Sequence, residues 1–172
     1  DYISVRPPGL TAQKNAGVAT VRQEIDLVAI VDDDIVLHEG ALDAMMAHWE
    51  TAPAELGGAS FDMPDFVYGS QIWTKTALKR LFFVDDGYFG QVLKSGFSTP
   101  IWNVSDTRSC QWLGGGYTVW RKEVFEEFKF IEWYPGSGVF EDVHFSHQVS
   151  KKYDLAMVAG AHCTHLDPPA PL

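Results

Sequence analysis

The chain has 172 residues, a formal net charge of −10 at pH 7, 46% hydrophobic residues and 21% charged residues. This composition is ordinary for one globular domain with a substantial core. The negative charge argues against a nucleic-acid partner, which requires a basic face, and against an anionic membrane surface. No apolar run approaches the roughly 20 residues of a membrane span, so no transmembrane segment is predicted.

Two cysteines, Cys110 and Cys163, are too few for a disulfide scaffold. Their number favours a reducing compartment. We therefore expect a cytoplasmic location, and a peripheral position at the inner face of a membrane stays open as an alternative.

The first predicted element is a short helix over residues 12–16, capped by Thr11 after the breaker Pro7-Pro8-Gly9. Lys14 and Asn15 are adjacent polar residues in this helix. They could face a ligand at the edge of a sheet, although such a pair is more often part of a solvated surface.

A run of five apolar residues, 27–31, leads directly into Asp32, Asp33 and Asp34. A short β-branched run of this kind predicts a central parallel strand that is buried on both faces. Open α/β sheets bind ligands at the carboxyl ends of such strands. Three adjacent carboxylates repel one another and need a counter-charge, and oxygen ligands suit magnesium, manganese or calcium. The pattern predicts a divalent-metal site; the alternative is an acidic cap for the next helix.

The residues that follow the aspartates contain a regular helical pattern first and an irregular, aromatic-rich stretch later. Leu42, Met45, Met46 and Trp49 recur at helical spacing, which predicts an amphipathic helix through residue 50. A strand is predicted over residues 59–61. Residues 62–112 are rich in aromatic residues and predict a short helix over 74–83 between long loops. Exposed rings such as Trp112 could stack on sugar faces, although filling of the core explains most of these residues and is favoured for any single one.

The last third contains four further signals. Gly114-Gly115-Gly116 allows the backbone to approach another group closely, or forms a tight turn. A helix is predicted over 121–128, with Val124, Phe125 and Phe128 on its inner face, and another from Glu141-Asp142 to residue 151. The helix dipole alone would favour that acidic pair. A strand over 155–163 precedes His165, which taken alone would more often be a surface histidine than a metal ligand.

The order of these motifs resembles the family 2 glycosyltransferases, which have the GT-A fold. Asp32-Asp33-Asp34 matches the DXD motif of that family, and Glu141-Asp142 in GVFEDVHFSHQV matches its ED element. The segment LGGGYTVWRKEVFEEF resembles the stretch that shapes the acceptor side. PGLTAQKNAGV resembles the stretch before the DXD strand, and His165 in LAMVAGAHCTHLDPP falls where many members have a histidine.

The resemblance implies a single α/β domain over residues 1–172, with a GT-A-like (Rossmann-like) mixed sheet flanked by helices. Residues 1–61 would form the donor- and metal-binding part, and residues 62–172 the acceptor side. Members of the family begin with a strand–helix–strand unit of about 70 to 90 residues that holds the nucleoside. This chain begins where that unit ends, so the fold is expected to be incomplete on its N-terminal side.

The function implied by the resemblance is metal-dependent, inverting transfer of a sugar from a nucleotide-diphosphate donor to the hydroxyl of a saccharide or another acceptor. Asp142 would be the general base, and Glu141 would position the acceptor or tune Asp142. Asp34, Asp32 and His165 would hold Mg²⁺ or Mn²⁺. The donor would contact Lys14, Asn15, Asp32 and Asp33, and the acceptor Trp112, Gly114, Gly115 and Gly116.

Two other functions remain open. The chain could be a binding module of the same fold that holds carbohydrate or metal without turnover, or a metal-dependent phosphoester hydrolase that uses the aspartates and His165. An absent nucleoside unit would also leave an unpaired sheet edge, and such edges favour association. We therefore expect the isolated chain to form homo-oligomers or to be inert.

Overall fold

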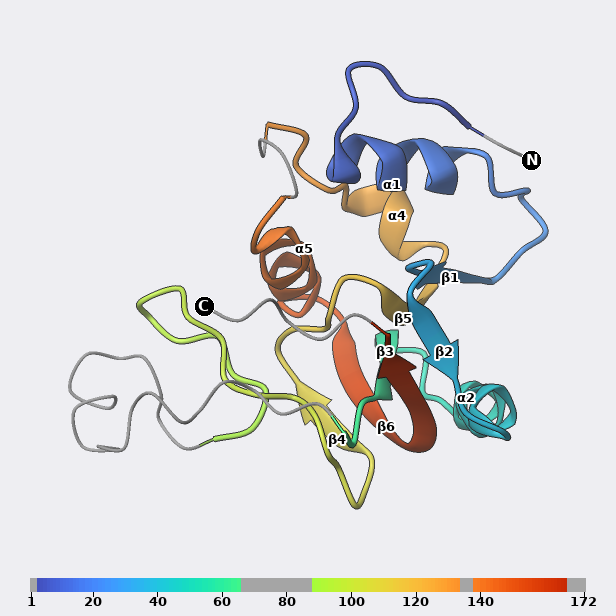
Figure 1. The fold of residues 1–172 in the computed structure, drawn as a ribbon, viewed down its shortest axis with the longest axis vertical. Coiled ribbons are helices and arrows are strands. Elements are labelled where there is room, and N and C mark those ends of the chain that lie inside the picture. Colours follow the sequence, from blue (N-terminus) through green and yellow to red (C-terminus); the bar gives the residue numbers. More distant parts are fainter. Residues whose placement is uncertain (1–2, 66–87, 134–137, 167–172) are drawn as a thin grey trace.

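A computed structural model describes residues 3–65, 88–133 and 138–166 (Figure 1). These residues form a mixed sheet flanked by helices, as the sequence predicts. The elements are α1 (Leu10–Ala19), β1 (Leu27–Val31), β2 (Ile35–Leu37), α2 (Ala41–Glu50), β3 (Leu56–Asp62), β4 (Arg108–Cys110), β5 (Tyr117–Arg121), α4 (Val124–Glu127), α5 (Glu141–Val149) and β6 (Asp154–His165).

The strand order of the sheet is β1-β5-β3-β6-β2, and β4 also pairs with β6. Strands β3 and β6 are parallel, and the other pairs are antiparallel. Strands β1 and β2 stand at the two ends of this order, yet only Asp32, Asp33 and Asp34 separate them in the chain. Three residues span little distance, so the sheet curls into a nearly closed, barrel-like shape. The mixed α/β class is thus confirmed, whereas this shape alone does not identify a GT-A fold.

Strand β1 is not the central, parallel strand that the sequence predicts. Among the described residues it pairs only with β5, and that pairing is antiparallel. Ala29 is exposed, and Val31 has 46% of its surface exposed. An all-apolar run reads the same whether a strand is central or lies at an edge of the sheet, which is why this prediction was wrong.

Two helices differ in detail from their predictions. Helix α1 begins at Leu10 after Gly9, so Thr11 lies inside the helix, where it is buried, and is not its cap. Helix α2 buries Ala41, Met45 and Trp49, whereas Leu42 and Met46 are 54% and 42% exposed. The buried stripe follows a spacing of four residues because α2 covers the sheet with one narrow face.

The segment 117–128 combines a strand with a short helix, where a single helix over 121–128 was predicted. Strand β5 continues to Arg121, and α4 covers only Val124–Glu127. Val124 and Phe125 are buried as predicted, and Phe128 is half-buried. The predictions of α5 and β6 are confirmed apart from their exact ends. Strands β2, β4 and β5 were not predicted, and the helix predicted over 74–83 lies outside the described residues.

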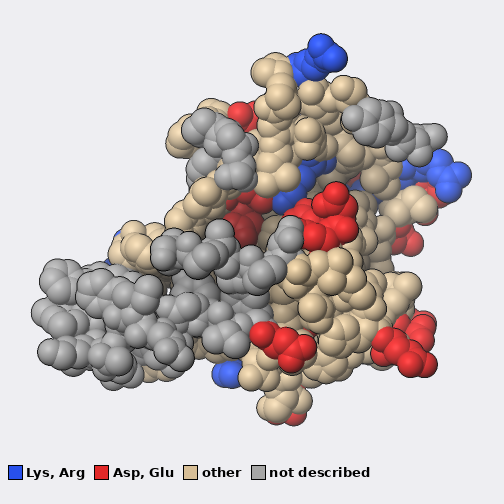
Figure 2. Space-filling model, viewed as in Figure 1, with Lys and Arg blue, Asp and Glu red and all other residues tan. Residues whose placement is uncertain are grey.

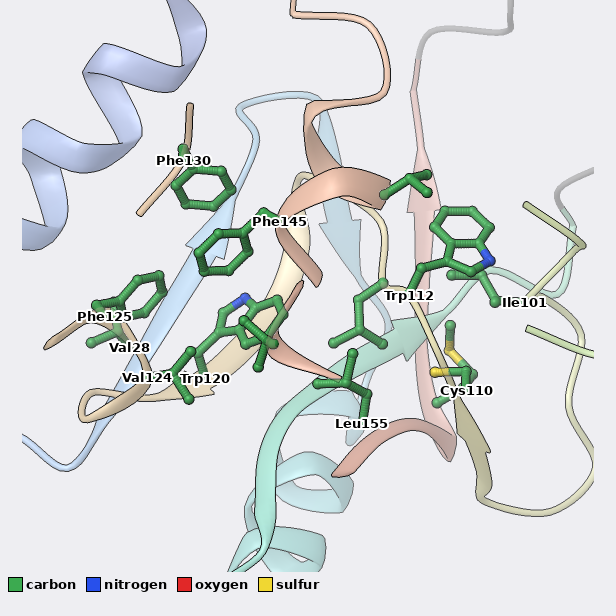
Figure 3. Packing of buried hydrophobic residues seen from close by; sticks show 14 of the residues in the cluster. Val28, Ile101, Cys110, Trp112, Trp120, Val124, Phe125, Phe130, Phe145 and Leu155 are labelled. Carbon is green, nitrogen blue, oxygen red and sulfur yellow. The ribbon is translucent and has the colours of Figure 1, made fainter. Parts of the chain in front are cut away.

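Side chains alternate along β5 between two hydrophobic clusters. Val119 packs on one face against α2, and Trp120 packs on the other against α5. In the second cluster Phe145 of α5 stacks on Phe130, with ring centroids 4.0 Å apart, and meets the edge of Trp120 at 5.1 Å (Figure 3). These contacts fix the orientation of α5 against β5. Within the described ranges, no helix is long and apolar enough to cross a membrane.

Candidate functional site

The end of β1, the glycine triplet and the first turn of α5 meet at one place. Because β1 and β5 are antiparallel, the residue after β1 lies beside the residue before β5, and the Asp32 N–H donates to the Gly116 carbonyl at 2.8 Å. On the other side of the triplet, the Leu113 N–H donates to Ser146 Oγ at 3.0 Å, and that hydroxyl donates to the Asp142 carbonyl at 2.5 Å. Acidic and basic side chains lie next to one another in a recess of the surface, just below α1 in this view (Figures 1 and 2).

The glycine triplet allows charged side chains to lie very close to the backbone, which is one of the two roles that the sequence suggests for it. A Cβ atom at Gly116 would lie 1.9 Å from Asp32 Oδ2. A Cβ atom at Gly115 would lie 2.9 Å from Glu141 Oε1 and 3.1 Å from Lys14 Nζ. Side chains at these positions would displace the charged groups on either side, so the turn accommodates only glycine without rearrangement.

Lys14 lies against the acidic pair of α5. Its Nζ donates to Glu141 Oε1 at 2.6 Å and to the Gly115 carbonyl at 2.8 Å. The Lys14 and Glu141 side chains are only 7% and 5% exposed. Their charges attract strongly because little water screens them. The structure therefore brings Lys14, predicted as a donor-binding residue, to the residues predicted as catalytic.

Asn15 has a different environment from Lys14. Its Nδ2 donates to the Phe130 carbonyl at 2.8 Å and to Glu132 Oε1 at 2.9 Å, and its Oδ1 accepts from the Phe130 N–H at 3.0 Å. Phe130 in turn lies under Lys14, with Nζ 5.3 Å from the ring centroid. In this structure Asn15 attaches α1 to the segment that carries Phe130, and both of its amide hydrogens are used for that purpose.

The two carboxyl groups at the head of α5 have raised pKa values. Burial is the main cause for Glu141, opposed by Lys14 and reinforced by the charges of Asp142 and Asp32. Burial also raises the pKa of Asp142, opposed chiefly by the Val143 N–H and Lys14 and reinforced by Asp32. Three carboxylates thus share one lysine. A carboxyl group with a raised pKa is better suited to accept a proton near neutral pH.

Asp34 and His165 lie together at the other end of the aspartate cluster. Asp34 Oδ2 is 3.3 Å from His165 Nε2, because Ile35 at the start of β2 pairs with His165 of β6. Asp34 Oδ1 is buried and has no hydrogen-bond partner among the described residues. Asp33 is exposed.

The fit of this region to a metal can be tested on its donor atoms. The described part of the chain contains no group of three or more His, Cys, Asp or Glu side chains that could hold a metal by themselves. Magnesium, however, is commonly bound by one or two carboxylates together with substrate phosphates and water. The buried Asp34 Oδ1 and the neighbouring His165 fit that incomplete kind of set.

Trp112 lies in the core, away from the solvent. It is 5% exposed and belongs to a buried hydrophobic cluster (Figure 3). Its indole N–H donates to the Thr99 carbonyl at 2.9 Å, and its ring meets the edge of Trp102. Sequence reasoning missed Ser146, which joins α5 to the glycine turn. Its signal was available, because a serine four residues after Asp142 lies on the same side of the helix, one turn away.

Comparisons with known proteins do not identify a relative. The sequence matches no protein-family model, and a search of curated proteins gives no match.

Proposed function

We propose that the chain is the catalytic region of a metal-dependent, inverting glycosyltransferase with a GT-A-like arrangement and a nucleotide-diphosphate sugar as donor. One observation carries the proposal. Asp32 and the Glu141-Asp142 pair come from opposite ends of the chain, yet they lie on either side of the same glycine turn. A donor held at the aspartates and an acceptor at α5 would then meet between them.

Asp142 is the residue best suited to be the general base. Its carboxyl group is half-buried and has a raised pKa, whereas Glu141 Oε1 is occupied by Lys14. Ser146 fixes the backbone of Asp142 through its carbonyl. Asp142 would accept the proton of the acceptor hydroxyl while that oxygen attacks the anomeric carbon from the face opposite the leaving group. Glu141 would hold Lys14 in place and keep the first turn of α5 rigid.

Asp34 and His165 are the residues that would hold Mg²⁺ or Mn²⁺, with Asp32 and Asp33 beside the donor. When bound, the metal neutralises the negative charge on the leaving diphosphate. Lys14 is engaged with Glu141 and Gly115 in this structure, so its role is to balance the carboxylates rather than to contact the donor directly.

The test compares Asp142→Asn with Asp43→Asn. Asp43 occupies the first turn of α2 and is exposed, so its substitution removes a charge at a helix start without touching the site. With a panel of nucleotide-diphosphate sugars, Asp142→Asn should lower the rate of nucleoside-diphosphate release by about 10²- to 10⁴-fold and leave the melting temperature nearly unchanged. Asp43→Asn should leave the rate unchanged.

Three results would contradict the proposal. Asp142→Asn could turn over at the wild-type rate, which would place the base elsewhere. Metal or sugar binding without turnover of any donor would indicate a binding module. Release of inorganic phosphate from a phosphoester would indicate a hydrolase.

A further inference from the structure

Phe140, the residue that immediately precedes the acidic pair, has an unusual backbone conformation. Its φ and ψ angles are 67° and 12°, in the left-handed region, and it is the N-cap residue of α5. Bulky residues rarely adopt positive φ. Strain of this kind persists where the surrounding structure imposes it, often at functional sites. The Glu141 N–H donates to the Gly138 carbonyl and the His144 N–H to the Phe140 carbonyl, so the backbone on both sides of Phe140 is held.

The Phe140 side chain is also unusual, because it is 49% exposed at the head of a helix whose other phenylalanine is buried. Its ring meets the ring of Phe97, with centroids 6.4 Å apart and planes at 79°. Phe97 is 46% exposed. Its carbonyl accepts from the Leu93 N–H at 2.8 Å within a small turn, and Val92 and Ser98 form a β-bridge beside it. Two separate, hydrogen-bonded segments thus bring two exposed rings into edge-to-face contact, and one of these rings belongs to the residue that precedes the acidic pair.

We propose that Phe97 and Phe140 form the stacking platform for the acceptor, and that the acceptor is a neutral sugar. This inference rests on the proposed function, since the acceptor hydroxyl must reach Asp142, two residues from Phe140. A pyranose ring has an apolar C–H face that packs on an aromatic ring and a polar rim that the neighbouring carboxylates can bind. Three carboxylates, Asp32, Glu141 and Asp142, with a single lysine among them, repel an anionic ligand. We therefore expect uronic acids and acidic phospholipids to bind less well than neutral sugars.

The test measures sugar binding directly, so that it does not depend on turnover. Saturation-transfer NMR, with irradiation of the aromatic protons of the protein, is recorded with the methyl glycosides of glucose, galactose, mannose and N-acetylglucosamine, and with methyl glucuronide. The wild-type protein serves as the reference, because no donor is present and all three carboxylates must be retained for the comparison with methyl glucuronide. At least one neutral glycoside should receive saturation on its ring C–H protons, and methyl glucuronide should receive none.

Two variants assign the signal to the platform. Phe140→Gly should weaken binding about tenfold or more, yet it should keep or raise the melting temperature, because glycine adopts positive φ without strain. Phe97→Ala should weaken binding similarly. Leu42→Ala is the control, because it removes an exposed apolar side chain from α2, which packs on the face of the sheet opposite to α5. This variant should leave binding unchanged.

The possible results separate the platform from the proposed function. The platform is refuted if no neutral glycoside receives saturation, or if binding survives in both phenylalanine variants. It is also refuted if methyl glucuronide, or vesicles of phosphatidylcholine offered in place of a sugar, bind as well as the neutral glycosides do. Transfer that depends on Asp142 but not on Phe140 would refute the platform alone. Binding that depends on Phe140 without transfer from any donor would refute the proposed function alone.

Discussion

Removal of the Lys14 charge should destabilise the fold in a manner that depends on pH. Lys14→Met leaves Glu141 buried without its counter-charge, and breaking a buried ion pair from one side typically costs about 3 to 5 kcal/mol. The Gly115 carbonyl also loses its donor, which adds about 1 kcal/mol. We therefore expect the free energy of unfolding to fall by roughly 4 to 6 kcal/mol at mildly alkaline pH.

The pH dependence follows from the pKa of Glu141, which burial raises and Lys14 partly lowers. A carboxyl group whose pKa is higher in the folded state favours folding at pH values below its unfolded pKa. This contribution disappears as the pH rises through the folded pKa. Without Lys14 the pKa of Glu141 rises further, so the deficit of Lys14→Met should be largest at alkaline pH and should shrink in acid.

The assay is urea unfolding followed by tryptophan fluorescence at a mildly alkaline and a mildly acidic pH. The double variant Lys14→Met/Glu141→Leu should recover most of the loss, because both charges are then absent. Lys152→Met breaks a fully solvated ion pair with Glu127 and should have a much smaller effect. A loss below about 1 kcal/mol that does not vary with pH would show that solvent screens the Lys14–Glu141 pair.

Two further sets of substitutions examine other parts of the structure. Gly116→Ala would place a methyl group 1.9 Å from Asp32 Oδ2. The rate of sugar transfer should therefore fall at least tenfold, which corresponds to about 1.4 kcal/mol of transition-state stabilisation. Gly17→Ala is the control, because its Cβ meets no atom within 4 Å, and it should remain active. Ala29→Lys and Val31→Lys add charge to exposed positions of the edge strand β1, and they should abolish the expected self-association. The measurement is light scattering across a concentration series. Wild-type protein that stays monomeric at every concentration would show that this edge does not drive assembly.

The sequence predicts the elements that have a strong local pattern. Strands β1, β3 and β6 and helices α2 and α5 follow from apolar runs, helical spacing and the acidic start of α5. The position of β1 at an edge could not be predicted, because pairing with β5 depends on residues about ninety positions away. Strand β5 was missed because Tyr117 to Trp120 is a short run that directly follows the glycine triplet and leads into the predicted helix.

The candidate site was predicted in part for the same reason. Residue types and motif order pointed to Lys14, the aspartates and Glu141-Asp142, but not to the ion pair between Lys14 and Glu141 across the glycine turn. That contact is tertiary, since it requires α1 to lie beside α5. The exposed ring of Phe140 could not be anticipated either, because no local pattern indicates a phenylalanine with positive φ.

Helix α1 carries the positive charge of the site, yet it is weakly attached to the rest of the domain. Thr11 is its only buried residue, and the contacts of Lys14 and Asn15 supply its hydrogen bonds to α5, to the glycine turn and to the segment carrying Phe130. Elements with few buried apolar contacts open at a lower free energy than the core. Detachment of α1 would therefore require less free energy than global unfolding, and it would uncover Glu141 and remove the counter-charge in one step. Amide hydrogen exchange should accordingly be faster in α1 than in α2, and the electrostatics of the site would be governed by how often that helix is in place.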